Sequence, residues 1–470
     1  MNTKQYFPLH ALPIQIILIS FSIFCSTSMQ ATKSHQLYVF VHGTVKPPEI
    51  PFSSLFQIMR DEIDSLLYKD VVEHLRRDTY YARGQAMQDL GLHPITLDHI
   101  TERTSSHTVA QLYNIQLETQ GIDTSKVLYY TFGWSGLLSD KKRYEASVNL
   151  YKELTQELNH LATQGIFPDI HLIGYSHGGN ILLYLPEVRK KEKLQPFVVK
   201  QLITLATPIQ RDTAFFVFDD MFQSVYNFYS LDDNVQTADI FSSKHQFFSK
   251  RLFFTANKEQ LPEKIKQVRI RIIKKFRKKH TDTEKINYTV LTHKKYKPVY
   301  KDPGHSELWC FKSCTHYYRP SFPLNPFPFM IFLPTIIHTI QTHCPDLHNL
   351  TCSIAPTVHG MVFSTQKEKI TAPFIEKTTY EKMKVISQLF EQTYCDYESQ
   401  QSHTTQTVET AKRSYNERIN RQRSTHKQNN APNHEPRCHR KLYLKNYRKT
   451  LHKYAVTFNL TSTTKHLPYT

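Results

Sequence analysis

The stretch His171–Asn180 has the sequence HLIGYSHGGN and contains a G-x-S-x-G motif centred on Ser176. The apolar run 170–173 predicts a buried strand before the motif, and the apolar residues 181–185 predict a helix after it. The glycines on either side of the serine leave room for a sharp turn that lifts its hydroxyl clear of a sheet. The motif therefore predicts a nucleophilic serine between a strand and a helix; a glycine-rich turn without chemistry is the alternative.

Further strand candidates lie on both sides of this motif. They are apolar, β-branched or aromatic runs at residues 37–41, 127–132, 202–205, 225–229 and 286–292. Apolar residues at helical spacing predict a helix over 144–161, and the apolar stretch 329–340 predicts a helix that closes the core. Strands that alternate with helices favour the α/β class, with a mostly parallel sheet flanked by helices. Catalytic residues of such a sheet lie at the carboxyl ends of its strands.

The first residues, 1–28, predict a secretory signal peptide. Lys4 precedes a short apolar stretch, 14–24, and small residues follow it, with cleavage expected after Ser28. The apolar stretch is short for a membrane span, although a modest extension would make an uncleaved N-terminal anchor. We therefore expect an exported protein that is secreted, periplasmic or part of the cell envelope, with a membrane anchor as the alternative.

Export would allow disulfide bonds among the cysteines that follow Cys25, which all lie near or within the last third of the chain. Cys310 and Cys314 are close enough in sequence to pair locally, and so are Cys344 and Cys352. The six cysteines after Cys25 allow 15 connectivities, and the sequence does not choose among them. Histidines lie near these cysteines, but their spacing matches no standard zinc site, so we expect no metal.

A formal net charge of +18 makes an acidic partner plausible, and many basic residues lie in 264–279. This segment fits a helix with an apolar stripe as well as an alternating strand, and its period does not separate the two. Its functional interpretation is a basic surface that meets an anionic membrane, and a solvated protein face is the alternative. The chain has no reader motif for nucleic acid, so we do not expect that partner. The oligomeric state is not predicted.

The domain organisation follows from these patterns. We expect one α/β domain at 35–345, with a helical insertion at about 52–120 and a basic insertion at about 237–285. Residues 346–398 predict a small C-terminal extension. The remaining residues, 399–470, are basic and poor in apolar side chains, and this composition predicts a disordered tail.

A catalytic triad can be assembled from residues that follow different predicted strands. Ser176 is the candidate nucleophile, and His305 is the candidate base because it lies in the loop after the last predicted strand. Asp233, after the preceding strand, is the candidate acid that orients the imidazole, and the adjacent Asp232 is the alternative. The chain order of serine, aspartate and histidine is the order this architecture uses.

The same reasoning assigns supporting residues. The oxyanion hole would use the backbone N–H of His177 and one from the loop that contains Gly43 and Thr44, after the first strand. Trp134 and Tyr175 are candidates for contact with the substrate. This chemistry requires neither a metal nor another cofactor.

The motifs resemble those of the α/β-hydrolase serine esterases and lipases, nearest to the lipase-like group that includes the GPI inositol deacylases. The resemblance covers about residues 35–345 and rests on VHGT at 41–44, GYSHGG at 174–179, LATP at 205–208, YSLDDNVQ at 229–236 and GHSEL at 304–308. In that group the pattern Y-S-x-x-D-x-V-Q carries the acid at its fifth position, which implies Asp233. The long basic segment between acid and histidine departs from a minimal hydrolase.

These observations predict an exported serine hydrolase that cleaves an ester of a lipid or another acyl substrate through an acyl-enzyme. An acyltransferase, thioesterase or amidase would use the same triad and is the alternative within enzymes. A non-catalytic scaffold that binds membranes or acidic partners is the alternative outside enzymes.

Overall fold

The structure is a computed structural model, and the residues that it describes fall within the unit formed by residues 1–412. It describes residues 34–45, 84–97, 104–238, 249–255, 261–278, 291, 296–311 and 321–398. The predicted signal peptide, the predicted tail at 399–470 and most of the predicted strand at 286–292 therefore lie outside the described residues.

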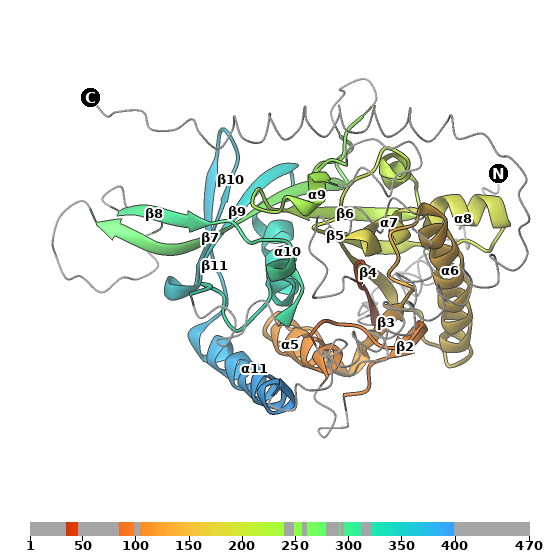
Figure 1. Cartoon of the computed structure of the whole chain (residues 1–470), viewed down its shortest axis with the longest axis horizontal. Coiled ribbons are helices and arrows are strands. Elements are labelled where there is room, and N and C mark those ends of the chain that lie inside the picture. Colours follow the sequence, from red (N-terminus) through yellow and green to blue (C-terminus); the bar gives the residue numbers. More distant parts are fainter. Residues whose placement is uncertain are drawn as a thin grey trace, which may run out of the picture. The chain divides into compact units, whose positions relative to one another are not determined.

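A single sheet of 11 strands forms the centre of the unit, in the order β11-β10-β9-β7-β6-β5-β4-β1-β3-β2, with β8 paired to β7 (Figure 1). Its parallel part consists of β3 (Val127–Gly133), β1 (Gln36–Val41), β4 (Asp169–Tyr175), β5 (Val199–Leu205), β6 (Phe222–Tyr229), β7 (Ile265–Lys278) and β9 (Asn349–Ala355). Antiparallel strands add to it at the edges and on β7, namely β2 (Gly91–Pro94), β10 (Gly360–Ser364), β11 (Lys369–Pro373) and β8 (Tyr296–Lys301).

Both faces of the sheet are covered, and strand β1 shows how. Its residues Leu37, Val39 and Val41 enter one apolar cluster, whereas Tyr38 and Phe40 enter the other, as the alternation of side chains along a strand requires. The first cluster is completed by α6 (Asp140–Thr163), α7 (His177–Leu183) and α8 (Leu185–Glu192). The second is completed by α5 (Ser105–Thr119), α10 (Leu333–His343) and α11 (Lys377–Glu398). This mostly parallel, doubly covered sheet confirms the predicted α/β class.

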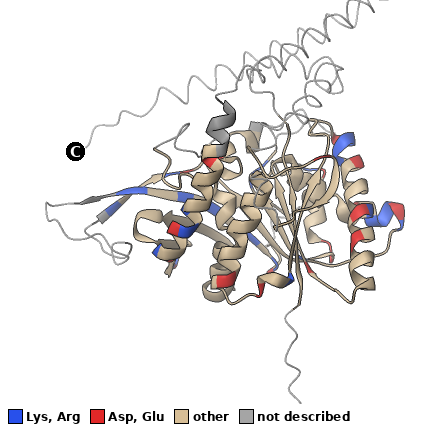
Figure 2. Cartoon of the chain, turned by 90° about the horizontal axis from the view of Figure 1, so that it is seen from below, with Lys and Arg blue, Asp and Glu red and all other residues tan. Residues whose placement is uncertain are grey.

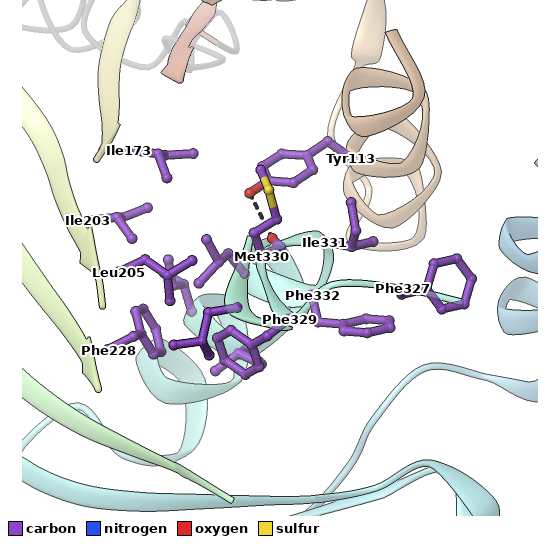
Figure 3. Close-up of a cluster of buried hydrophobic side chains, with 14 of the residues drawn as sticks. Tyr113, Ile173, Ile203, Leu205, Phe228, Phe327, Phe329, Met330, Ile331 and Phe332 are labelled. Atoms are coloured by element: carbon purple, nitrogen blue, oxygen red, sulfur yellow. Dashed lines mark hydrogen bonds between the residues drawn. The ribbon is translucent and has the colours of Figure 1, made fainter. Parts of the chain in front are cut away.

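The second cluster is anchored by the 3-10 turn Phe329–Phe332 (η6), which leads into α10. Figure 3 shows Phe329 and Met330 facing apolar side chains of the strands, among them Leu205 and Phe228. The Tyr113 hydroxyl of α5 donates a hydrogen bond of 3.0 Å to the Met330 carbonyl in the same cluster. The apolar stretch 329–340 therefore closes the core as predicted.

The described part of the basic segment, 264–278, is not part of an insertion, because β7 is an inner strand of the sheet. Val268, Ile270 and Ile272 are fully buried in the second cluster. The Lys264 ammonium donates to the carbonyls of Phe218, Asp219 and Phe222, and the Lys266 ammonium donates to the carbonyls of Pro345 and Leu347. Burial lowers the pKa of both ammonium groups below their ordinary value. Because residues 265–278 form a strand, the helical alternative for this segment is wrong.

Solvent reaches only part of the positive charge on this strand. Lys274 and Lys275 are exposed, towards the end of β7 that pairs with β8, where Figure 2 shows lysine and arginine along the ribbon. Neither β7 nor β8 contains an aspartate or a glutamate. The exposed charge is thus confined to the half of β7 that extends past the parallel pairing with β6.

The domain boundaries also differ from the prediction. Residues 346–398 are not a separate extension, because β9 pairs in parallel with β7 and continues the same sheet through β10 and β11. Within the predicted insertion 52–120, the described residues supply the edge strand β2 and the helix α5, which packs in the second cluster. The remaining residues of that insertion, 52–83 and 98–103, lie outside the described residues.

The described cysteines are thiols. Cys310, Cys344 and Cys352 form no disulfide, so the local pairing of Cys344 with Cys352 does not occur. Burial raises the pKa of the Cys310 thiol to about 12. Among the described residues, no group of three or more histidine, cysteine, aspartate or glutamate side chains could hold a metal ion. Within the same residues, no helix combines the length and apolar character needed to cross a membrane.

Candidate active site

Ser176 lies at the sharp turn between β4 and α7. Its backbone has φ 51° and ψ −126°, a conformation that residues other than glycine adopt only when their surroundings impose it. The Ser176 N–H donates to the Leu205 carbonyl of the neighbouring strand β5 at 2.9 Å, and the Ser176 carbonyl accepts from Gly179 at 3.1 Å. Strained backbone of this kind clusters at functional sites. The predicted strand–turn–helix around Ser176 is therefore present.

Two glycines are required for this turn because the chain packs against itself there. A Cβ at Gly178 would lie 2.4 Å from the Val41 carbonyl oxygen and 2.5 Å from that of His42, both at the end of β1. A Cβ at Gly174 would lie 2.6 Å from the Gly179 Cα. Real side chains do not approach backbone atoms this closely. The two glycines therefore let α7 begin in direct contact with the carboxyl ends of β1 and β4.

Ser176, His305 and Asp233 form one chain of hydrogen bonds. The His305 Nε2 lies 3.0 Å from the Ser176 Oγ, and the His305 Nδ1 lies 2.7 Å from the Asp233 Oδ2. An ionised carboxylate only accepts hydrogen bonds, so Nδ1 carries the imidazole proton and Nε2 presents its lone pair to the serine hydroxyl. This tautomer is the one that can take a proton from Ser176.

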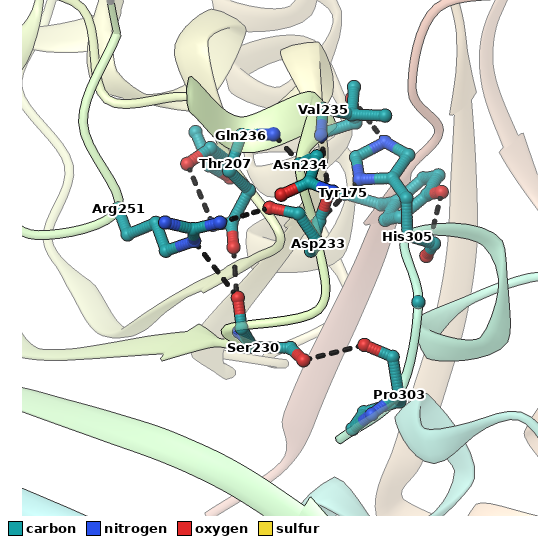
Figure 4. A network of polar contacts seen from close by, with 12 residues as sticks. Tyr175, Thr207, Ser230, Asp233, Asn234, Val235, Gln236, Arg251, Pro303 and His305 are labelled. Atoms are coloured by element: carbon teal, nitrogen blue, oxygen red, sulfur yellow. Dashed lines mark hydrogen bonds and ion pairs between the residues drawn. The ribbon is translucent and has the colours of Figure 1, made fainter. Parts of the chain in front are cut away.

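The structure distinguishes the two adjacent aspartates. Asp233 is fully buried, and its Oδ1 accepts from the backbone N–H groups of Val235 at 3.0 Å and Gln236 at 3.3 Å (Figure 4). Asp232 is exposed and lines a hollow of about 370 Å³ between the aspartate loop and the histidine loop. Asp233, and not Asp232, is therefore the carboxylate that meets His305.

The loop that carries His305 is held on several sides. The Tyr175 hydroxyl donates to the His305 carbonyl at 3.1 Å, and the Ser230 hydroxyl donates to the Pro303 carbonyl at 2.5 Å (Figure 4). A carboxylate oxygen of Glu307 accepts from the Gly304 N–H at 2.7 Å. These contacts fix the backbone on both sides of His305.

An ion pair also reaches this loop from β7. A carboxylate oxygen of Asp302 lies 2.7 Å from the Arg269 Nη2, and the other lies 3.4 Å from the Arg271 Nε. Asp302 is only 8% exposed, so solvent screens these pairs less than it would on an open surface. The strand predicted as an insertion therefore supports the histidine loop.

The loop after β1 lies directly against the serine. A Cβ at Gly43 would lie 2.8 Å from the Ser176 Cβ. The His42 Nε2 accepts from the Trp134 N–H at 3.2 Å, so its Nδ1 carries the proton that is donated to the Gly43 carbonyl at 2.7 Å. Because a trans peptide points its C=O and N–H in opposite directions, this contact turns the Thr44 N–H away from the His42 ring.

His177 is the first residue of α7 and directly follows Ser176, whereas Gly43 and Thr44 lie in the loop after β1. The predicted oxyanion residues His177, Gly43 and Thr44 are therefore placed on two segments that adjoin Ser176. Backbone donors in such a position can stabilise a negative oxygen.

Trp134 and Tyr175 are packed inside the protein rather than on an open surface, which differs from their predicted contact with substrate. Trp134 is 2% exposed and its indole N–H donates to the His42 carbonyl at 2.7 Å. Tyr175 is 5% exposed, and its ring stacks on Trp309 with centroids 5.2 Å apart. Both side chains therefore support the loops around the site.

Several polar residues that hold these loops were not predicted from the sequence. Arg251 lies in a segment with no periodic pattern, and nothing in its neighbours indicated a contact with the aspartate loop. In the sequence, Arg269 is one of many basic residues in 264–279, and Asp302 is an aspartate in a loop. Neither position indicates the ion pair between them. Glu307 belongs to the GHSEL motif at 304–308, and this motif is the sequence signal for its role.

Comparison with known proteins adds little to this geometry. No model of a known protein family matches the chain, and no curated protein matches it. Among solved structures, the chain is similar to a protein from Lactobacillus plantarum WCFS1 that is provisionally named a cell surface hydrolase. That similarity has 13% sequence identity and a TM-score of 0.19, and it covers 43% of this chain and 70% of the other. At these values it supports no conclusion about activity.

Proposed function

We propose that the chain is an α/β-hydrolase that cleaves carboxylic esters, with a lipid or another acyl compound as substrate. The observation that carries this proposal is the hydrogen-bonded chain from the Ser176 Oγ through His305 to the buried Asp233. These three residues come from different loops of a mostly parallel sheet, and the serine has the strained backbone of a nucleophile turn.

In the proposed reaction, the Ser176 Oγ attacks the ester carbonyl carbon while its proton passes to the His305 Nε2. The carbonyl π electrons move onto oxygen, and the resulting tetrahedral oxyanion is bound by backbone N–H groups of His177 and of the Gly43–Thr44 loop. When the oxyanion collapses, the C–O bond to the alcohol breaks, and the imidazolium returns its proton to the leaving alkoxide.

The second half of the proposed reaction repeats these steps with water. His305 takes a proton from a water molecule, whose oxygen attacks the acyl-enzyme carbonyl. When the second oxyanion collapses, the acyl C–Oγ bond breaks, the imidazolium returns its proton to the Ser176 Oγ, and the carboxylic acid is released. Asp233 stays ionised throughout and stabilises the imidazolium through the His305 Nδ1. The protein's own side chains carry every proton transfer in this scheme.

We also propose that the protein is exported, because residues 1–28 have the sequence features of a signal peptide. The exposed Lys274 and Lys275 of β7 are proposed to meet an anionic membrane surface. This contact would be electrostatic, because Val268, Ile270 and Ile272 of β7 are buried in the sheet.

The proposed activity is tested with a panel of 4-nitrophenyl esters from acetate to palmitate. We expect the wild type to hydrolyse at least one chain length and Ser176→Ala to lose that hydrolysis. Ser224→Ala, which removes a half-buried hydroxyl of β6 that donates to the Lys200 carbonyl, is the matched control and should retain wild-type kcat. Equal hydrolysis by wild type and Ser176→Ala, or no hydrolysis of any ester by folded wild type, would contradict the proposal.

A further inference from the structure

The guanidinium of Arg251 holds the loop that carries Asp233. Its Nε donates to the Ser230 carbonyl at 3.0 Å, and its Nη2 donates to the Leu231 carbonyl at 3.1 Å and to the Asp233 carbonyl at 2.8 Å. Figure 4 shows the Arg251 side chain reaching this loop from its own segment. The Arg251 side chain therefore binds three backbone carbonyls of this loop, including that of Asp233 itself.

Arg251 itself stands on a segment that is fixed to the sheet. Its carbonyl accepts from the Asn227 side chain of β6 at 2.9 Å. The preceding residue, Lys250, forms a two-way backbone bridge with Ile209 through bonds of 2.8 and 2.9 Å. The backbone that carries the guanidinium is thus hydrogen-bonded to β6 through Asn227 and to the backbone of Ile209.

The geometry separates Arg251 from the acid–base chain itself. The Asp233 carboxylate is bonded to His305 and to the N–H groups of Val235 and Gln236. In contrast, each hydrogen bond that Arg251 donates to a described residue goes to a backbone carbonyl. Three carbonyl oxygens that converge on one point repel one another unless a donor group neutralises them. Without Arg251 these carbonyls lose a shared donor, and their repulsion favours a displacement of the turn that carries Asp233.

We propose that Arg251 is a positioning residue that fixes the Asp233 loop so that the carboxylate stays in hydrogen-bond contact with His305. The inference rests on the proposed function, since its effect is on the triad. A guanidinium suits this task because its donors lie in one rigid plane and can address separate carbonyls, whereas a lysine ammonium is a single point charge. Displacements of about 1 Å near a reacting centre can cost about 100-fold in rate.

The test uses the full chain with three variants and a soluble ester, 4-nitrophenyl butyrate. We expect Arg251→Met to lower kcat by about 10- to 100-fold while KM stays within about twofold. Arg251→Lys should recover part of this loss because it restores a donor with positive charge. Arg189→Ala is the matched control, because Arg189 pairs with Asp219 and Asp220 on the surface, and it should retain wild-type kcat.

A spectroscopic readout separates positioning from a general loss of stability. The proton shared between the His305 Nδ1 and Asp233 should give a far-downfield proton resonance in the wild type, assigned by its loss in His305→Ala. In Arg251→Met this resonance should shift or broaden, whereas in Arg189→Ala it should not change. Circular dichroism establishes that each variant is folded.

The outcomes are distinguishable from those that test the proposed function. A folded wild type that hydrolyses no ester refutes the proposed function, and the Arg251 proposal with it. An active wild type together with a folded Arg251→Met that keeps both kcat and the resonance refutes the Arg251 proposal alone. If Arg251→Met does not fold, Arg251→Lys decides. In a folded Arg251→Lys, a kcat about threefold or more below wild type supports positioning, and wild-type values refute it.

Discussion

The Ser176 Oγ and the His305 Nε2 lie 3.0 Å apart, although 129 positions separate them in the chain. Ser176 follows β4, near the middle of the sheet, whereas His305 follows β8, which among the described strands pairs with β7 alone. The contact therefore depends on β7. This strand pairs in parallel with β6, and its residues Arg269 and Arg271 form ion pairs with Asp302, three residues before the histidine.

The assignment of the acid is tested by replacing each of the adjacent aspartates. Asp233→Asn should lower kcat by about 10⁴-fold, because an amide at this position stabilises the wrong imidazole tautomer. Asp232→Asn is the matched control and should stay within about twofold of wild type, since its side chain is exposed. Steady-state hydrolysis of a 4-nitrophenyl ester measures both. Equal losses in the two variants would show that the geometry does not describe the working acid.

The close packing at the nucleophile turn predicts a specific stability effect. Gly178→Ala should lower the free energy of unfolding by about 1–3 kcal/mol or more, because its Cβ would meet two backbone carbonyls that cannot rotate away. Gly304→Ala is the control within the same site, because its Cβ would touch only a Glu307 oxygen at 3.7 Å. Urea unfolding compares the two variants. A Gly178→Ala protein as stable as Gly304→Ala would contradict the packing at the turn.

The buried His171 predicts a dependence of stability on pH. Burial lowers its pKa from the ordinary 6.5 to about 4, so the unfolded chain binds its proton more tightly than the folded chain does. Stability from this group is complete above the unfolded pKa and is lost as the pH falls through the interval between about 6.5 and 4. The shift corresponds to about 3 kcal/mol in total.

His171→Phe should therefore flatten the fall of the unfolding free energy between about pH 6.5 and 4, while the aromatic ring keeps its place on Tyr38. The exposed His160 provides the control, and His160→Phe should keep the wild-type slope. Urea unfolding across this pH range measures the slope. The same slope in His171→Phe as in wild type would show that the site does not behave as a buried neutral histidine.

The membrane proposal is tested at the exposed end of β7. Replacing Lys274 and Lys275 together by serine should reduce binding to vesicles that contain phosphatidylserine by about 2 kcal/mol, or about 30-fold, at low salt. The control removes two exposed lysines of α6, with Lys141→Ser and Lys152→Ser, and should bind like wild type. Co-sedimentation with vesicles measures the affinity. If both double variants lose the same affinity, net charge and not this strand is responsible.

The sequence could predict the serine turn because its local requirements are strong. A buried strand, a tight glycine-flanked turn and a helix each leave a clear pattern around Ser176, and the strands β1, β3, β5 and β6 are dense in β-branched and aromatic residues. His305 and Asp233 could be proposed because each follows a predicted strand.

The sequence could not place β7, because its charged residues are paired by distant parts of the chain. Arg269 and Arg271 alternate with buried isoleucines, and their partner Asp302 lies in the histidine loop. Lys266 is accommodated by carbonyls near the start of β9. Tertiary contacts of this kind leave no local pattern in the sequence. The composition of β7 therefore resembles that of a solvated or membrane-binding segment, although β7 is a core strand. The contacts of Arg251 were hidden for the same reason.

The measurement that tests the central claim most directly is labelling with a fluorophosphonate probe, which reacts with an activated serine hydroxyl. The account predicts that the folded wild type becomes covalently labelled at Ser176, and that Ser176→Ala and His305→Ala do not. Labelling of Ser176→Ala at the wild-type rate, or no labelling of the folded wild type, would contradict the claim that Ser176 is an activated nucleophile.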